Sequence, residues 1–98
     1  MILVIGSVTL GEGHLAAALA QSHEHVARSR TEPGCIAHAV HQDAENPQRL
    51  VFVEEWSSMA ALQQHFAVPA SRAFVRSLGA LATVAPAMTI YDATRVGP

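Results

Sequence analysis

The 98-residue sequence has no lysine, a single cysteine and only 14% charged residues. Its six arginines and eight acidic residues give a net charge of −2 and form no basic block, which argues against binding to nucleic acid or to an anionic membrane. Cys35 alone cannot form an internal disulfide, and a cysteine-rich metal site needs more thiolates. This cysteine content suits the reducing cytoplasm.

The common motifs for phosphate binding and for serine catalysis are missing as well. Gly6, Gly11 and Gly13 form neither of the usual phosphate loops, GxGxxG and GxxxxGK[ST], and the sequence GxSxG does not occur. The apolar start of the chain, residues 1–5, lacks positive charge and turns polar by Gly11. We therefore expect neither a signal peptide nor a membrane span there.

What remains is an apolar chain, with 50% hydrophobic residues, of the length of one domain, which we expect to cover residues 1–98. Apolar residues alternate in some segments, as in strands, and recur every three or four positions in others, as in helices. The first expected elements are a strand over 2–9, a helix over 14–30, and strands over 35–42 and 49–56 that a loop joins. A second helix is expected to start near residue 58, to break, and to restart at 69 and run to 81. A last strand is expected over 83–94.

The order strand, helix, strand, strand, helix, strand predicts an α+β fold of the ferredoxin-like βαββαβ type. In that fold both helices lie on one face of an antiparallel sheet. The opposite face is then uncovered, and Val51 and Val53 are expected to point to it. We therefore expect a homodimer in which a second copy packs its sheet against this face.

Six histidines are the first candidates for chemistry, because imidazole exchanges protons near pH 7. No two of them stand four residues apart, so the sequence offers no helical metal-binding pair, and we expect no metal site. The histidines expected to be solvated surface residues are His14, His23, His25 and His41.

Two other side chains are predicted to point inward. His65 follows Leu62 by three residues, so it borders the helix face that packs on the sheet. Glu54 alternates along its strand with Phe52 and Trp56 and shares their face. A carboxylate in these surroundings needs a partner, so Glu54 either meets a histidine or satisfies a turn or a helix end.

Three further residues allow more than one interpretation or carry a weak signal. By strand alternation His38 shares a face with Ile36 and Val40, where it is either a satisfied core histidine or part of a site. Trp56 is either a core residue or the wall of a site. Cys35 has no basic neighbour in the sequence that would lower its pKa, so we interpret it as structural.

Several stretches of the chain, taken together, resemble the antibiotic biosynthesis monooxygenase domain, which includes quinol monooxygenases. They are Glu32-Pro33-Gly34-Cys35-Ile36, Phe52-Val53-Glu54-Glu55-Trp56, Ala61-Leu62 with His65, and Phe74. The resemblance covers nearly the whole chain. It implies a ferredoxin-like homodimer, or dimeric α/β barrel, with a pocket between the sheet and the helices.

The resemblance also implies a cofactor-independent monooxygenase that oxidises a small phenolic, hydroquinone or polyketide-like aromatic substrate. Such a substrate must lose a proton before it can give an electron to dioxygen, and a histidine base suits that step. His65 is the candidate base and His38 the alternative, with Glu54 orienting the histidine. The expected pocket walls are Trp56, Phe52, Leu62 and Phe74.

Two other functions stay open: a non-catalytic dimer that binds small ligands, and a protein that binds or degrades haem. Relatives that degrade haem use an asparagine on the first strand together with a tryptophan and a histidine. Trp56 and His65 match the last two, whereas Ser7 or Thr9 stands where the asparagine is expected. Family members also often carry tyrosine at the position of His38, so the resemblance does not specify a substrate.

Overall fold

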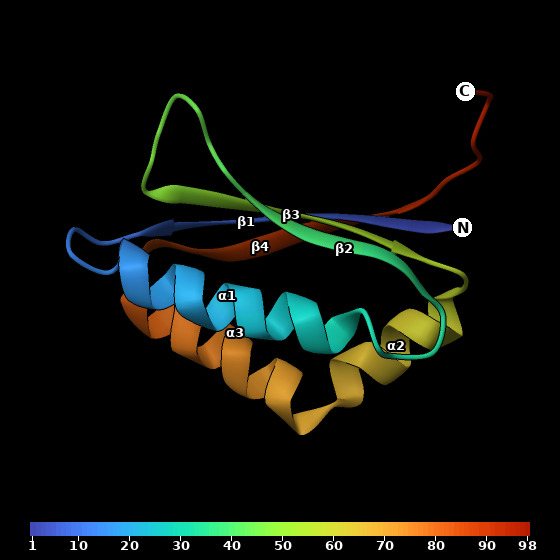
Figure 1. Cartoon of the computed structure of the whole chain (residues 1–98), viewed down its shortest axis with the longest axis horizontal. Coiled ribbons are helices and arrows are strands. Elements are labelled where there is room, and N and C mark those ends of the chain that lie inside the picture. Colours follow the sequence, from blue (N-terminus) through green and yellow to red (C-terminus); the bar gives the residue numbers. More distant parts are fainter.

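Four strands form one antiparallel sheet and three helices cover one of its faces in the computed structural model, which describes residues 1–98 (Figure 1). The elements are β1 (Ile2–Leu10), α1 (Leu15–Ser29), β2 (Cys35–Gln42), β3 (Arg49–Trp56), α2 (Met59–Ala67), α3 (Pro69–Leu81) and β4 (Ala82–Asp92). The strand order is β2-β3-β1-β4. The predicted ferredoxin-like fold is confirmed, and the expected element boundaries agree to within two residues.

Alternation along β3 decides what each face of the sheet carries. Leu50, Phe52, Glu54 and Trp56 are buried beneath the helices, whereas the residues between them are only partly buried. The neighbouring strand β1 continues this pattern, because Val4 lies opposite Glu54 in the register. One face of the sheet therefore packs on the helices and the other has no element of the chain over it (Figure 1).

Local sequence explains why the second helical segment is broken. Ser58 caps α2 by accepting a hydrogen bond from the backbone N–H of Ala61 at 3.1 Å. Val68 is extended, with ψ 123°, and Pro69 begins α3 at a position where its missing N–H is not needed. None of the three helices has the length and apolar character to cross a membrane.

The turn between α1 and β2 requires glycine at position 34. Gly34 has φ +83°, and a Cβ added there would lie 2.5 Å from the Cβ of Ala61 and 2.7 Å from Oγ of Ser57. Both the backbone conformation and the lack of space exclude a side chain. The loop that carries Glu32 can therefore pack directly against the start of α2.

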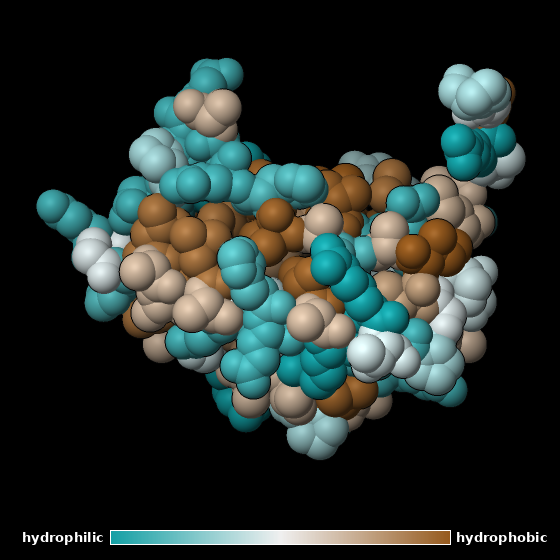
Figure 2. Space-filling model, viewed as in Figure 1, coloured by the Kyte–Doolittle hydropathy of each residue, from teal (hydrophilic) through white to brown (hydrophobic).

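The core consists of two apolar clusters, one of Val8, Leu10, Ala18, Leu50, Phe52 and Leu78 and a smaller one of Val4, Trp56 and Leu62. On β3, Glu54 stands between Phe52 of the first cluster and Trp56 of the second. A polar layer thus interrupts the core. Figure 2 shows hydrophobic side chains gathered in a band at the level of the sheet and the layer beneath it.

Candidate functional site

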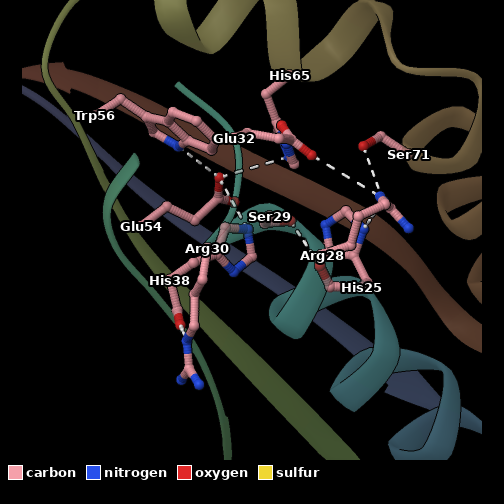
Figure 3. A network of polar contacts seen from close by, with 10 residues as sticks. All are labelled: His25, Arg28, Ser29, Arg30, Glu32, His38, Glu54, Trp56, His65 and Ser71. Carbon is pink, nitrogen blue, oxygen red and sulfur yellow. Dashed lines mark hydrogen bonds and ion pairs between the residues drawn. The ribbon is translucent and has the colours of Figure 1, made fainter. Parts of the chain in front are cut away.

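The polar layer is built from buried and partly buried side chains that five different segments bring together (Figure 3). They are His25 and Arg28 of α1, Glu32 of the following loop, His38 of β2, Glu54 of β3 and His65 of α2. The ring centroids of the three histidines lie 5.2 to 5.6 Å apart. The prediction that His65 and Glu54 point inward is confirmed.

The expectation that His25 is a solvated residue is wrong. Its side chain is only 5% exposed, because residue 25 lies on the face of α1 that also buries Ser22 and Ser29. The three-residue spacing from Ser22 places His25 on this buried helix face. The burial was missed because histidine is a polar residue.

Glu54 lies beside a histidine, which is one of the two interpretations that the sequence allowed. Its Oε1 accepts a hydrogen bond from Nε1 of Trp56 at 3.0 Å and lies 3.3 Å from Nε2 of His38 and 4.0 Å from Nε2 of His65. Burial alone raises the pKa of Glu54, but His38, the Trp56 hydrogen bond and His65 together outweigh it, so the pKa lies below its ordinary value. At neutral pH the carboxylate is therefore ionised.

His38 supports Glu54 from within the core. Both of its ring nitrogens are enclosed and make no aligned hydrogen bond, although Nε2 is close to the carboxylate. Ile36 does not share its face as expected: the register shifts between Cys35 and Ala37, and Ile36 is 57% exposed. This β-bulge breaks the alternation on which the prediction depended.

Cys35 lies partly buried against the smaller apolar cluster. Burial raises the pKa of its thiol, and the negative charges of Glu32 and Glu54 raise it further. A protonated thiol is a poor nucleophile. The interpretation of Cys35 as a structural residue is consistent with this environment.

His65 is held by a carboxylate that sequence reasoning did not assign to it. Its Nδ1 lies 2.7 Å from Oε1 of Glu32, which is 33 residues away in the chain. A carboxylate can only accept this hydrogen bond, so Nδ1 of His65 donates, and whenever the ring is neutral its lone pair is on Nε2. Glu32, rather than Glu54, therefore orients His65 as a base.

His25 is held in the opposite tautomer. Nη2 of Arg28 lies 2.8 Å from its Nδ1, and because a guanidinium has only donors, Nδ1 must accept. Burial, the charges of His38 and His65, and Arg28 lower the pKa of His25 to about 3. At neutral pH the ring is thus uncharged, with its proton on Nε2.

Arg28 and Glu32 connect the two histidines. Nε of Arg28 lies 3.8 Å from Oε2 of Glu32, and Nη2 also donates to Oγ of Ser71 on α3 at 3.1 Å. The same carboxylate therefore binds His65 and positions the arginine that binds His25.

A cavity of about 140 Å³ lies between the sheet and α3, beside this polar layer. Its lining includes His25, Glu54, Phe52, Phe74 and Met88. The ring of Phe74 stacks on His25, with centroids 4.1 Å apart and an angle of 11° between the planes. The cavity lining is thus largely apolar, with His25 and Glu54 among its few polar residues.

The sequence-predicted site residues fall into three groups in relation to this cavity. Phe52, Phe74 and Glu54 line it. His38 and His65 lie behind Glu54 and His25, in the polar layer. The remaining two, Trp56 and Leu62, are fully buried in the smaller apolar cluster.

The three histidines also have to be considered as a metal site, because one nitrogen of each lies within 4.8 Å of the others. Metal ligation requires a lone pair on each nitrogen. Arg28 occupies Nδ1 of His25 and leaves a hydrogen on Nε2, so only His38 and His65 offer lone pairs. The neighbouring guanidinium charge further disfavours a cation at this place.

The profile of the family described as Antibiotic biosynthesis monooxygenase matches residues 1–77, and the chain belongs to this family. An uncharacterised protein of Synechocystis, sll1783, is 32% identical over 74 residues, which make up 76% of this chain. The match spans 50% of that relative's own length.

Solved structures support the same assignment. A crystal structure of an antibiotic biosynthesis monooxygenase superposes with a TM-score of 0.89 and 28% identity, over 97% of this chain and 100% of that chain. A protein of Deinococcus radiodurans superposes with a TM-score of 0.94 over 100% of this chain and 97% of its own, at 22% identity. The second likeness is one of fold.

Proposed function

We propose that the protein is a monooxygenase that oxidises a small electron-rich aromatic compound, a phenol or a hydroquinone, without a cofactor. The observation that carries this proposal is an aromatic-lined cavity with the ionised Glu54 at its wall and the base-oriented His65 directly behind. The cavity volume of about 140 Å³ is close to the roughly 150 Å³ of an engineered apolar cavity that binds benzene. One aromatic ring therefore fits, whereas a haem is far larger.

The substrate has to supply the electrons in such a reaction. Dioxygen is a triplet and reacts slowly with closed-shell molecules, but a phenolate can transfer one electron to it. Superoxide then combines with the phenoxyl radical at a ring carbon. Loss of water from the resulting hydroperoxide leaves a quinone, so phenol plus dioxygen gives quinone plus water.

The protein's part is to bind the ring and remove its proton in a site that excludes water. Phe52 and Phe74 hold the ring, and Glu54 accepts the hydrogen bond of the phenolic O–H. His65 takes the proton, through Glu54 or through one water, and Glu32 stabilises the imidazolium that forms. His38 is the alternative acceptor. General-base catalysis of this kind is worth about 10²–10⁴-fold in rate.

In our proposal Trp56 and Leu62 support the site from behind. The indole N–H holds Oε1 of Glu54, which leaves the other oxygen free for the substrate. Leu62 packs against Trp56 in the same cluster. Their effect on a ligand is therefore exerted through the position of Glu54.

Oxygen uptake with a panel of hydroquinones and naphthols tests the proposal. We expect the colourless protein to accelerate uptake, and His65→Gln to lower kcat by about 100-fold while thermal unfolding stays within a few degrees of the wild type. His41→Gln, on the exposed part of β2, is the matched control. Ring binding without any oxygen uptake would favour a non-catalytic binding protein, and full activity in a His65→Ala, His38→Ala double variant would exclude the proposed bases.

We also propose that two copies pair through the uncovered face of the sheet. Leu3, Ile5, Val51, Val53 and Tyr91 share this face by register, and Ile5 and Tyr91 are 37% and 49% exposed. Apolar surface of this kind is typical of an interface. The β2–β3 loop and the C-terminal segment rise on the same side and border the face (Figure 1).

A further inference from the structure

The buried imidazole of His25 has no role in the proton transfer proposed above. It lies at the wall of the cavity, stacked on Phe74, and yet Arg28 prevents its Nδ1 from acting as a base. A buried polar ring at this place needs its remaining nitrogen satisfied. What Nε2 can bind therefore decides what the ring contributes.

Nε2 of His25 is an unused hydrogen-bond donor. It makes no hydrogen bond within the chain, it is not one of the enclosed atoms without a partner, and its ring is part of the cavity lining. Its tautomer is fixed by geometry, because Arg28 lies 2.8 Å from Nδ1 and can only donate. Arg28 is in turn held by Ser71 and Glu32.

We propose that Nε2–H of His25 donates a hydrogen bond to the phenolate oxygen of the bound substrate and stabilises the anion there. The inference rests on the proposed function for the identity of the ligand. A neutral imidazole is suited to this task, because it can donate without offering a proton that the anion would take up. The guanidinium at Nδ1 withdraws electron density from the ring and strengthens the donor.

In this proposal the two histidine tautomers have different roles. His65 presents a lone pair and removes the proton, and His25 presents an N–H and holds the oxygen that has lost it. Glu54, at the cavity wall, positions the O–H before the transfer. A low pKa for His25, which keeps the ring uncharged across the neutral range, is consistent with this role.

The tautomer is tested directly on the wild-type protein. We expect long-range ¹H–¹⁵N correlation spectra at neutral pH to show the hydrogen of His25 on Nε2 and that of His65 on Nδ1. The opposite tautomer at His25 would overturn the inference. This measurement does not depend on any activity.

Binding of 4-nitrophenol, a single ring whose phenolate is coloured, tests the contact with the ligand. We expect the bound phenol to have a lowered pKa in the wild type. His25→Phe, which keeps the stacked ring, should weaken phenolate binding by about 10- to 100-fold, as loss of a hydrogen bond to a charged group does. It should leave binding of 4-nitroanisole, which cannot ionise, within about twofold.

His23→Phe, on the exposed side of the same helix, is the matched control and should bind phenolate like the wild type. His25→Gln is a second variant in case His25→Phe does not fold; its amide N–H should restore part of the affinity for phenolate. Equal phenolate affinity in the wild type and in a folded His25→Phe variant would overturn the inference. If phenolate binds through His25 but no phenol causes oxygen uptake, the inference about His25 is supported. Only the proposed monooxygenase function is then contradicted.

Discussion

His25 and His65 lie with their ring centroids 5.2 Å apart, and their Nδ1 atoms bind groups of opposite charge. Arg28 donates to one ring and Glu32 accepts from the other. Two histidine side chains of the same polar layer thereby present different nitrogens as donor and acceptor. A site that must both remove a proton and hold the resulting anion needs this pairing of acceptor and donor.

Glu32→Gln is expected to lower kcat by about 10- to 100-fold with a small change in KM. The amide keeps the shape of the side chain but removes the charge that stabilises the His65 imidazolium, and it weakens the hold on Arg28. Steady-state oxygen uptake measures both constants. Glu45→Gln, in the exposed β2–β3 loop, is the control, and an unchanged kcat in Glu32→Gln would remove Glu32 from the mechanism.

The fold should lose stability on acidification between pH 6.5 and about 3. Folded His25 resists protonation down to a pKa of about 3, whereas the unfolded residue protonates near its ordinary 6.5, so unfolding takes up a proton in this window. The contribution of His25 to the free energy of unfolding is complete above pH 6.5 and is lost as the pH falls. The slope is at most about 1.4 kcal/mol per pH unit. The lowered pKa of Glu54 acts in the same direction at the acid end.

Urea unfolding at a series of pH values measures this slope. His25→Phe removes the titrating group and should flatten the curve between pH 6 and 5. A variant at the solvated His23 should leave the curve unchanged. An equally steep curve in His25→Phe would show that another group causes the acid sensitivity.

Leu62→Ala and Phe74→Ala should separate support of the site from contact with the ligand. Leu62 is fully buried, so its truncation should cost about 2–5 kcal/mol in the free energy of unfolding. Phe74 lines the cavity and stacks on His25, so its truncation should raise KM by a larger factor than Leu62→Ala. The reverse ranking in KM would place the ligand beside Leu62.

Val53→Glu should convert a dimer into a monomer. The side chain lies on the uncovered face, opposite Ile5 in the register, where a carboxylate would be buried without a partner in the interface. Sedimentation at micromolar concentration checks the change in mass. A monomeric wild type under the same conditions would contradict the proposed pairing.

Chelators should leave oxygen uptake unchanged. The Arg28 hydrogen bond removes one of the three nitrogen lone pairs that a metal at the histidine cluster would need. Oxygen uptake is measured after exhaustive treatment with EDTA, and dialysis without chelator is the control. Loss of activity that added metal restores would contradict a cofactor-independent reaction.

Much of the fold could be predicted from the sequence because its signals are local. The alternation along β3 places Glu54 inward, and Pro69 marks the break between α2 and α3. The partners of the site could not be read in the same way. Glu32 meets His65 across 33 residues, and His25 has a polar side chain on a helix face whose burial depends on α3 packing over it.

The bulge at Ile36 has a consequence for how the chain tolerates changes in length. Cys35 and His38 both face the helices although three positions separate them, because Ile36 adds one residue to the strand opposite Glu55. Removing Ile36 would leave a regular strand with both side chains still on that face. A deletion of Ile36 therefore leaves the register of His38 with Glu54 unchanged. A deletion between His38 and Val40 would instead turn either His38 or Val40 to the opposite face of the sheet.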